Sequence, residues 1–209
     1  MRVEIELLSP RAATDAGLVA ALTAMVNRAY ADGEQGLWRD SVPRTSEADL
    51  AGLIALGEIA VARLSGDLAG LVRVQQLSPT LGEFGLLVAA TEHKGAGVGR
   101  ELVRFAEDRA RGLGLPGMQL ELLVPRTGSH PVKEFLRAWY TRLGYREAGS
   151  GELADAHPQL APLLAVPCTF LIFRKDLQRR PAQPTQVRAD GRAASRSGGM
   201  GRPQSSQMP

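Results

Sequence analysis

The sequence predicts an α+β fold, in which a mixed β-sheet of about seven strands is flanked by about four helices. Two observations predict it. Strand-like apolar segments follow one another in the first half of the chain with only short turns between them, as antiparallel neighbours do. Two longer segments with apolar residues at helical spacing separate strands in the second half. Short hairpins join only antiparallel strands, so the sheet must contain antiparallel pairs.

The first two expected elements are a strand and a helix. Val3, Ile5 and Leu7 alternate with charged residues and predict a half-buried strand. The next segment has apolar residues at helical spacing up to about residue 29, and Thr14 or Asp15 precedes it. Both residue types are good N-caps, so one of them is expected to begin the helix.

A short helix and three strands are expected next. Ser46 and Asp49 have capping-box spacing and predict a helix from about residue 46 to 56. Three segments of strand character follow, at residues 58–64, 68–77 and 83–90. The first two are joined by residues 65–67, whose sequence Ser-Gly-Asp is typical of a hairpin turn.

Helices and strands alternate in the rest of the chain. One helix is expected at residues 98–113 and another from about residue 130 to 143. The second is expected to bury its large apolar residues, namely Val132, Phe135, Leu136, Trp139 and Leu143. Strands are expected at residues 118–124, 145–148 and 168–175, with an irregular loop at residues 149–167.

The net charge of +3 on this chain of 209 residues is unevenly distributed. Residues 178–209 carry six arginines and one aspartate, whereas residues 1–177 carry 19 basic and 21 acidic residues. The last 32 residues also lack Leu, Ile, Phe, Trp and Tyr, so they have too little apolar surface to fold. We therefore expect one domain at residues 1–177 and a disordered tail rich in Arg, Pro, Gly and Ser at residues 178–209.

Composition limits the classes of protein that fit. A single cysteine, Cys168, excludes an internal disulfide, and with only three scattered histidines no metal site is expected. No segment approaches the roughly 20 apolar residues that span a bilayer, and the N-terminal segment lacks a signal-peptide pattern. We expect a cytoplasmic protein with no membrane partner. The oligomeric state, a homodimer included, stays open.

Three alternating glycines, Gly95, Gly97 and Gly99, lie between an expected strand and an expected helix. Glycine lets backbone N–H groups approach a ligand closely, and a helix start presents unpaired N–H groups and a positive dipole end. Lys94 and Arg100 add positive charge on either side. The segment predicts a phosphate site, with a tight turn that binds nothing as the alternative.

Two common glycine motifs do not match this segment. A P-loop has Lys and then Ser or Thr after its last glycine, but Arg100 and Glu101 follow Gly99. The dinucleotide-binding fingerprint requires a glycine at position 100 and a parallel βαβ start, whereas a hairpin is expected before this turn. Neither motif therefore explains the glycines.

Residues 83–102 closely resemble the cofactor motif of the GNAT acetyltransferase superfamily. The motif is Arg/Gln-x-x-Gly-x-Gly/Ala after a strand, and Lys94, Gly97 and Gly99 stand at its positions. Residues 135–145 resemble the family's second signature, Tyr-x-x-x-Gly-Phe/Tyr, at the end of a helix. The two motifs occur in the family's order, and the expected order of elements is similar as well.

This resemblance implies a GNAT-like fold and an N-acetyltransferase that uses acetyl-CoA as its co-substrate. The backbone of Leu87, Val88 and Ala89 is implied to pair with the pantetheine arm like an added strand. The pyrophosphate is implied to bind at the turn and helix start, which comprise Lys94, Gly95, Ala96, Gly97, Val98, Gly99 and Arg100. Two positions depart from the family pattern, because Lys94 replaces Arg or Gln and Lys133 replaces a frequent Asn.

Amide formation from a thioester requires a neutral amine and a protonated leaving group. Tyr140, at the signature position, is implied to protonate the leaving thiolate. Glu83 is the candidate base, and a surface carboxylate is its structural interpretation. Glu121 is the alternative base, and a paired structural acid is its structural interpretation. Cys168 opens an apolar strand and is expected to be a buried thiol, which favours direct transfer in a ternary complex.

The acceptor is expected between the loops at residues 30–45 and 149–167. These loops carry several acids near Trp38, namely Asp32, Glu34, Asp40, Glu152 and Asp155. An acidic rim would suit a cationic amine, from a small molecule or a peptide. Two other classes stay open: a non-catalytic acyl-CoA-sensing module and, less favoured, a nucleic-acid-associated protein that acts through its basic tail.

Overall fold

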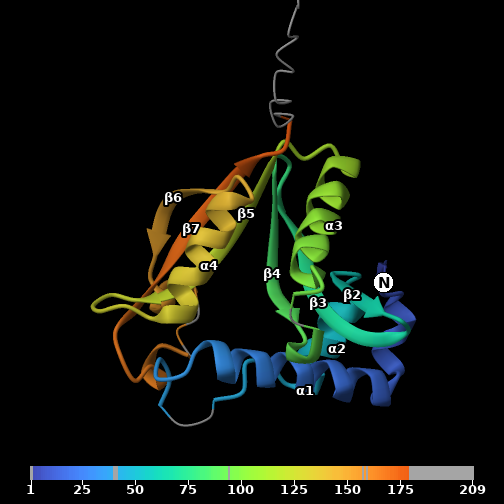
Figure 1. Ribbon diagram of the computed structural model, residues 1–209, viewed down its shortest axis with the longest axis horizontal. Coiled ribbons are helices and arrows are strands. Elements are labelled where there is room, and N and C mark those ends of the chain that lie inside the picture. Colours follow the sequence, from blue (N-terminus) through green and yellow to red (C-terminus); the bar gives the residue numbers. More distant parts are fainter. Residues whose placement is uncertain (1, 40–41, 94, 157, 159, 179–209) are drawn as a thin grey trace, which may run out of the picture. The chain divides into compact units, whose positions relative to one another are not determined.

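The computed structural model describes residues 2–39, 42–93, 95–156, 158 and 160–178. Its centre is a seven-stranded mixed sheet with the order β1-β2-β3-β4-β5-β7-β6, which confirms the predicted fold class (Figure 1). The β4–β5 pair is parallel, and the other neighbouring pairs are antiparallel. The strands are β1 Val3–Leu7, β2 Ile59–Leu64, β3 Asp67–Ser78, β4 Leu81–Ala89, β5 Gly117–Pro125, β6 Arg146–Gly151 and β7 Cys168–Asp176. The predicted tail lies outside the described residues apart from its first residue.

The described residues form five α-helices and three short 3-10 helices. The α-helices are α1 Ala16–Gly33, α2 Glu47–Ala55, α3 Val98–Gly112, α4 Pro131–Arg142 and α5 Leu153–Ala156. Two of them begin at predicted caps: Asp15 accepts the N–H of Leu18 at 3.0 Å, and Ser46 and Asp49 form a reciprocal capping box. Helix α5 lies in the segment predicted to be irregular. Among the described helices, none is long and apolar enough to cross a membrane.

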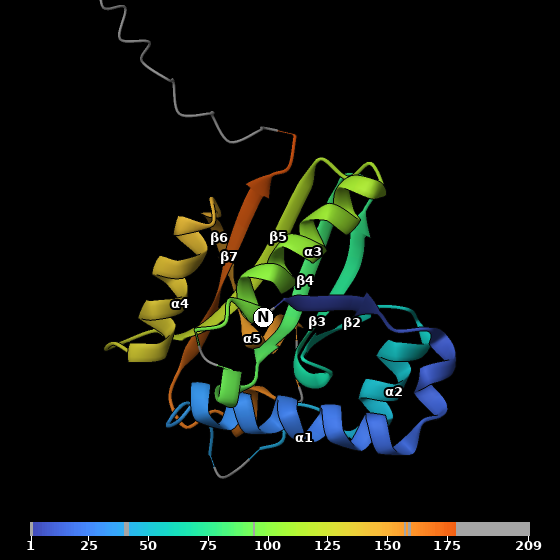
Figure 2. The same cartoon turned by 45° about the vertical axis from the view of Figure 1, so that its right-hand side comes forward.

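The helices cover both faces of the sheet, with α3 and α4 on one face and α1 and α2 on the other (Figure 2). The apolar residues of strand β2 are buried alternately on these two faces. Its residues Ile59 and Val61 are buried with α1 and α2, whereas Ala60 and Ala62 are buried with α3. Because successive side chains of a strand point to opposite faces, burial of both faces explains the nearly continuous apolar sequence of β2.

Strands β4 and β5 separate soon after they begin. Their parallel pairing covers three residue pairs and ends with Glu83 opposite Gln119. Beyond this point the two strands diverge, as Figure 1 shows, while β4 keeps its pairing with β3 on its other edge. The remaining edge of β4 therefore has no partner strand within the described residues, and the sheet opens there.

Helix α4 packs differently from its prediction. The side chain of Phe135 is predicted to be buried, but it is 61% exposed, and Val132 is also exposed. The buried residues of α4 are instead Lys133 and Tyr140, which are seven residues apart on one face. Three of the five predicted residues, Leu136, Trp139 and Leu143, do pack partly buried against the core, so the prediction is wrong for Phe135 and Val132. The helix packs mainly against β5 beside the opening of the sheet, and this contact buries only a narrow stripe.

Candidate functional site

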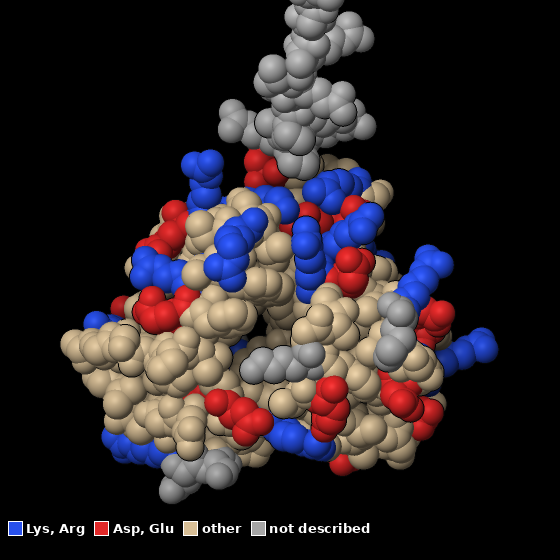
Figure 3. Space-filling view, viewed as in Figure 1, with Lys and Arg blue, Asp and Glu red and all other residues tan. Residues whose placement is uncertain are grey.

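A cavity of about 230 Å³ occupies the space where β4 and β5 separate. Leu87, Val88 and Ala89 of β4 line one side, and Tyr140 of α4 also lines it. Figure 3 shows the surface hollowed at this level, between α4 and β4. An unpaired strand edge presents N–H and C=O groups to any extended ligand that enters. The three residues implied to bind pantetheine therefore lie at this open edge.

Strand β4 has a bulge beside the cavity. Two of its residues, Leu86 and Leu87, stand opposite the single residue Val72 of β3. Leu86 has a φ of +45°, and such a conformation costs on the order of 1–3 kcal/mol for a residue with a side chain. Bulges redirect the groups of a strand and occur often next to active sites. The bulge and the positive φ of Leu86 thus lie in the middle of β4, beside the cavity.

The glycine turn leads into α3 with a backbone that favours glycine. Gly95 and Gly97 have φ values of +86° and +81°, which residues with side chains rarely adopt. Gly97 is the N-cap of α3, and no side chain caps this helix start. The first-turn N–H groups are therefore free to bind an anion, and the helix dipole favours negative charge there. Arg100 is exposed and makes no ion pair with any described residue, while Lys94 lies outside the described part.

The turn is also packed against α4. A Cβ atom at Gly99 would lie 3.6 Å from the ring of Trp139, so the indole packs close to the start of α3. Ala96 is exposed in the turn and donates its N–H to the carbonyl of His93 at 3.1 Å. The side chain of Val98 is buried in the core and anchors the start of α3. The predicted phosphate site is thus an exposed backbone surface that packs against α4.

Tyr140 is buried among aromatic rings, with centroid distances of 5.0 Å to Trp139 and 6.1 Å to Phe84. Its phenol has no hydrogen-bond partner among the residues that the structure describes. Burial raises the pKa of Tyr140 well above its ordinary value, and the nearby phenol of Tyr30 adds to this shift. The phenol therefore keeps its proton at neutral pH and is available as a donor to a group in the cavity.

Glu83 is the last residue of β4 that pairs with β5, and both of its carboxylate oxygens accept hydrogen bonds. One accepts a hydrogen bond from Gln75 at 2.7 Å and the other from Gln119 at 3.1 Å. These two amides are themselves held by Arg73 at 2.7 Å and Arg174 at 3.0 Å. The carboxylate of Glu83 is therefore one part of a hydrogen-bonded chain across the sheet.

Glu121 differs from Glu83 because its carboxylate has no hydrogen-bond or ion-pair partner among the described residues. It lines both the cavity and a larger pocket beside it. Desolvation raises the pKa of Glu121, the negative charge of Glu83 raises it further, and the positive charge of Arg44 opposes the shift. A carboxylate with a raised pKa holds a proton more strongly, which is the property that a base for an amine needs.

The larger pocket has a volume of about 890 Å³. It shares Tyr30, Arg44, Leu86 and Glu121 with the cavity, so the two spaces meet at the β4 bulge. Tyr30 belongs to α1, and the guanidinium of Arg44 lies 4.9 Å from the centroid of its ring. Both loops predicted to border an acceptor site line this pocket, through Arg44 and Leu160.

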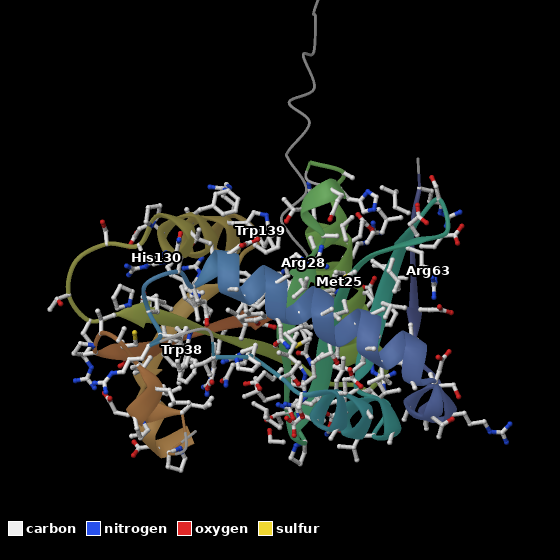
Figure 4. The ribbon with its side chains drawn as sticks, turned by 90° about the horizontal axis from the view of Figure 1, so that it is seen from below. Met25, Arg28, Trp38, Arg63, His130 and Trp139 are labelled. Atoms are coloured by element: carbon white, nitrogen blue, oxygen red, sulfur yellow. The ribbon has the colours of Figure 1, made fainter. Side chains whose placement is uncertain are left out.

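The predicted acidic rim is wrong for Glu34. Its side chain is only 6% exposed, and its carboxylate accepts hydrogen bonds from Lys133 at 2.8 Å and from the indole of Trp38 at 2.7 Å. Figure 4 shows Trp38 beyond the end of α1. Glu152 also has a partner within the protein, because it forms an ion pair with Arg126. A predicted surface acid becomes buried here because a lysine on another helix compensates its charge, which no local pattern reveals.

The remaining expectations concern reactive and metal-binding groups. Cys168 is buried as predicted, and burial raises the pKa of its thiol, which disfavours the reactive thiolate. The described residues contain no group of three or more His, Cys, Asp or Glu placed to hold a metal ion. No sequence pattern singles out Tyr30 or Arg44 as a lining residue of the two spaces. Arg44 stands in a polar, non-periodic loop, so no signal distinguishes it from other surface arginines.

Comparison with known proteins places this arrangement in a family. The model of the acetyltransferase (GNAT) family matches residues 23–145, which include the open edge of β4, the glycine turn and Tyr140. The chain belongs to the GNAT acetyltransferase family. As a GNAT member it is an N-acetyltransferase that uses acetyl-CoA.

Solved GNAT structures share the fold. The PaiA N-acetyltransferase from Thermoplasma acidophilum, in complex with coenzyme A, has a TM-score of 0.62 at 15% identity over 84% of this chain and 99% of its own. An aminoglycoside 6'-N-acetyltransferase complexed with coenzyme A has a TM-score of 0.61 at 15% identity, over 87% and 99%. Ard1 from Thermoplasma volcanium has a TM-score of 0.59 at 12% identity, over 84% and 98%. A comparison with curated proteins found no significant match.

Proposed function

We propose that this GNAT acetyltransferase transfers the acetyl group of acetyl-CoA to a primary amine by direct attack, with Glu121 as the base and Tyr140 as the acid. The observation that carries the proposal is that one cavity is lined by the open edge of β4, the protonated phenol of Tyr140 and the unpaired carboxylate of Glu121. The buried, protonated thiol of Cys168 supports a route without an acyl-enzyme.

Two backbone surfaces suit acetyl-CoA. The residues Leu87 to Ala89 would pair with the pantetheine arm along the open edge of β4, in the manner of an added strand. The N–H groups at the uncapped start of α3 would hold the pyrophosphate, with Arg100 adding positive charge. Acetyl-CoA supplies the activated acyl group as a thioester, and these residues bind and orient it.

Two residues carry out the proton transfers: Glu121, which is deprotonated, and Tyr140, which is protonated. Glu121 takes a proton from the ammonium form of the acceptor, directly or through water, and the neutral amine forms the new C–N bond. As the C–S bond breaks, Tyr140 gives its proton to the leaving thiolate. The amine loses a second proton when the amide is complete, and this proton returns through solvent to Tyr140. Glu83 acts on the reaction from a distance by raising the pKa of Glu121.

A thiol-release assay with acetyl-CoA and a panel of primary amines tests the proposal. We expect amine-dependent release that falls strongly in Glu121→Gln and Tyr140→Phe. Glu134→Gln is the matched control, because Glu134 is exposed on α4 and lies outside the proposed machinery. Tight binding of coenzyme A without release for any amine would contradict the proposal and favour an acyl-CoA-sensing module.

A further inference from the structure

The larger pocket contains several charged side chains, and most of them already have an ion-pair or hydrogen-bond partner within the protein. These residues are Arg44, Asp49, Arg73, Glu83 and Glu121. Arg73 forms an ion pair with Glu58 at 2.7 Å, and Asp49 accepts hydrogen bonds from Ser46 in the capping box of α2. Glu83 accepts one hydrogen bond on each oxygen. Each of these three side chains therefore already has a hydrogen-bond or ion-pair partner within the protein.

Arg44 and Glu121 are the other charged residues of this pocket. Neither makes an ion pair with another residue in the part of the chain that the structure describes. Both line the larger pocket as well as the smaller cavity, so they flank the junction at which the acceptor would meet the acetyl group. The pocket thus offers one positive and one negative side chain, neither of which has an ion-pair partner among the described residues.

Arg44 is held in place, although it has no acidic partner. The neighbouring residue Thr45 is fixed to α1, because Asn27 donates to its carbonyl and accepts from its N–H, both at 3.0 Å. The guanidinium then lies over the ring of Tyr30. Contact with Tyr30 uses only part of the five N–H donors of an arginine, and the planar fork matches a carboxylate. A fixed guanidinium loses little entropy when it binds such a group.

We propose, on the basis of the function proposed above, that the acceptor is an amine that also carries a carboxylate, an amino acid being the simplest example. Its ammonium group would lie at Glu121 and its carboxylate would pair with Arg44. The volume of about 890 Å³ leaves room for a side chain beyond these two groups. A polyamine or an aminoglycoside brings further positive charge toward Arg44 and has nothing to satisfy it.

The test compares matched acceptors that differ in one charge. The probes are the standard L-amino acids and their C-terminal carboxamides, with spermidine and an aminoglycoside as amines without a carboxylate. For the preferred amino acid we expect kcat/KM to exceed that of its amide by about 10- to 100-fold, as for a hydrogen-bonded charged group. The amine of the amide is more often neutral, with a pKa near 8, so this difference in basicity works against the expected result.

Two variants assign the preference to Arg44. In Arg44→Gln the amino acid and its amide should have similar kcat/KM, and Arg44→Lys should keep only part of the preference because it lacks the fork. Arg39→Gln is the control, since Arg39 is an exposed arginine of the same loop. Equal use of acids and amides by the unmodified protein, or a preference that survives in Arg44→Gln, would overturn this inference and leave the transferase function intact. If no amine in the whole set releases thiol, the proposed function itself fails.

Discussion

The Nζ atom of Lys133 lies 2.8 Å from Oε1 of Glu34, and both side chains are almost completely buried. This ion pair joins α4 to the residue that follows α1. The other oxygen of Glu34 accepts the indole N–H of Trp38, so the loop after α1 is attached to the same point. Burial lowers the pKa of Lys133, and the neighbouring Glu34 opposes that shift. Both residues of the pair line the cavity, which makes it part of the wall of the site.

Breaking this pair on one side should destabilise the protein strongly. In Lys133→Met the carboxylate of Glu34 stays buried without a compensating charge, at an expected cost of about 3–5 kcal/mol in the free energy of unfolding. The double variant Lys133→Met with Glu34→Leu should recover much of this loss. Arg137→Met removes an exposed partner of Glu147 and should change stability by less than about 1 kcal/mol. Denaturant unfolding measures all three, and a double variant no more stable than the single one would contradict the expectation.

Removing the phenol of Tyr140 should affect turnover more than stability. Tyr140→Phe deletes a hydroxyl without a hydrogen-bond partner among the described residues, so the fold loses little. Loss of the proton donor should lower kcat by about 10²-fold, within the range of general acid catalysis. The control is Tyr145→Phe, because the hydroxyl of Tyr145 donates to Glu107 at 3.0 Å. That variant should lose stability and keep its turnover. A normal kcat for Tyr140→Phe with its best acceptor would remove this residue from the mechanism.

Much of the fold follows from local sequence. Asp15 and Ser46 begin their helices as their capping patterns predict. The turn at Ser65 and Gly66 has positive φ at both residues, as a tight hairpin requires. These features depend on neighbours within a few residues. The exposure of Phe135 could not be predicted in this way, because it depends on where the diverging strands leave α4 without a surface to cover.

The candidate site likewise has some features that local sequence predicts and others that it does not. The glycine turn and Tyr140 are found from short motifs, because their roles depend on backbone conformation and position in one helix. The sequence indicates Glu83 as the candidate base and Glu121 as the alternative, whereas the structure leaves only the carboxylate of Glu121 without a hydrogen-bond partner among the described residues. One difference between them is what reaches them across the sheet, since Gln75 from β3 and Gln119 from β5 donate hydrogen bonds to Glu83. Contacts of that kind depend on strand register, which the pattern of a single strand does not fix.

The pH profile of the reaction should distinguish the two acids. A base must be deprotonated, so kcat/KM should fall as the pH drops through the raised pKa of Glu121. Glu83→Gln removes a charge that raises this pKa and should move the acid limb to lower pH. Arg44→Gln removes the opposing charge and should move it to higher pH. Glu121→Gln should lower the rate and abolish the limb. If the limb disappears in Glu83→Gln and remains in Glu121→Gln, the assignment of the base is reversed.

Two glycines at the ends of α3 allow an effect on coenzyme A binding to be distinguished from an effect on stability. Gly97 and Gly114 lie at opposite ends of α3 with φ of +81° and +75°, and a Cβ at either would meet no atom within 4 Å. Alanine at each position should therefore cost a similar amount of stability, about 1–2 kcal/mol for the left-handed conformation. Only Gly97→Ala disturbs the uncapped N–H groups proposed to hold the pyrophosphate, and it should raise the Kd for coenzyme A by about tenfold or more in calorimetry. Gly114→Ala should bind coenzyme A normally. Since both variants carry the same backbone strain, equal affinities would show that the start of α3 does not hold the pyrophosphate.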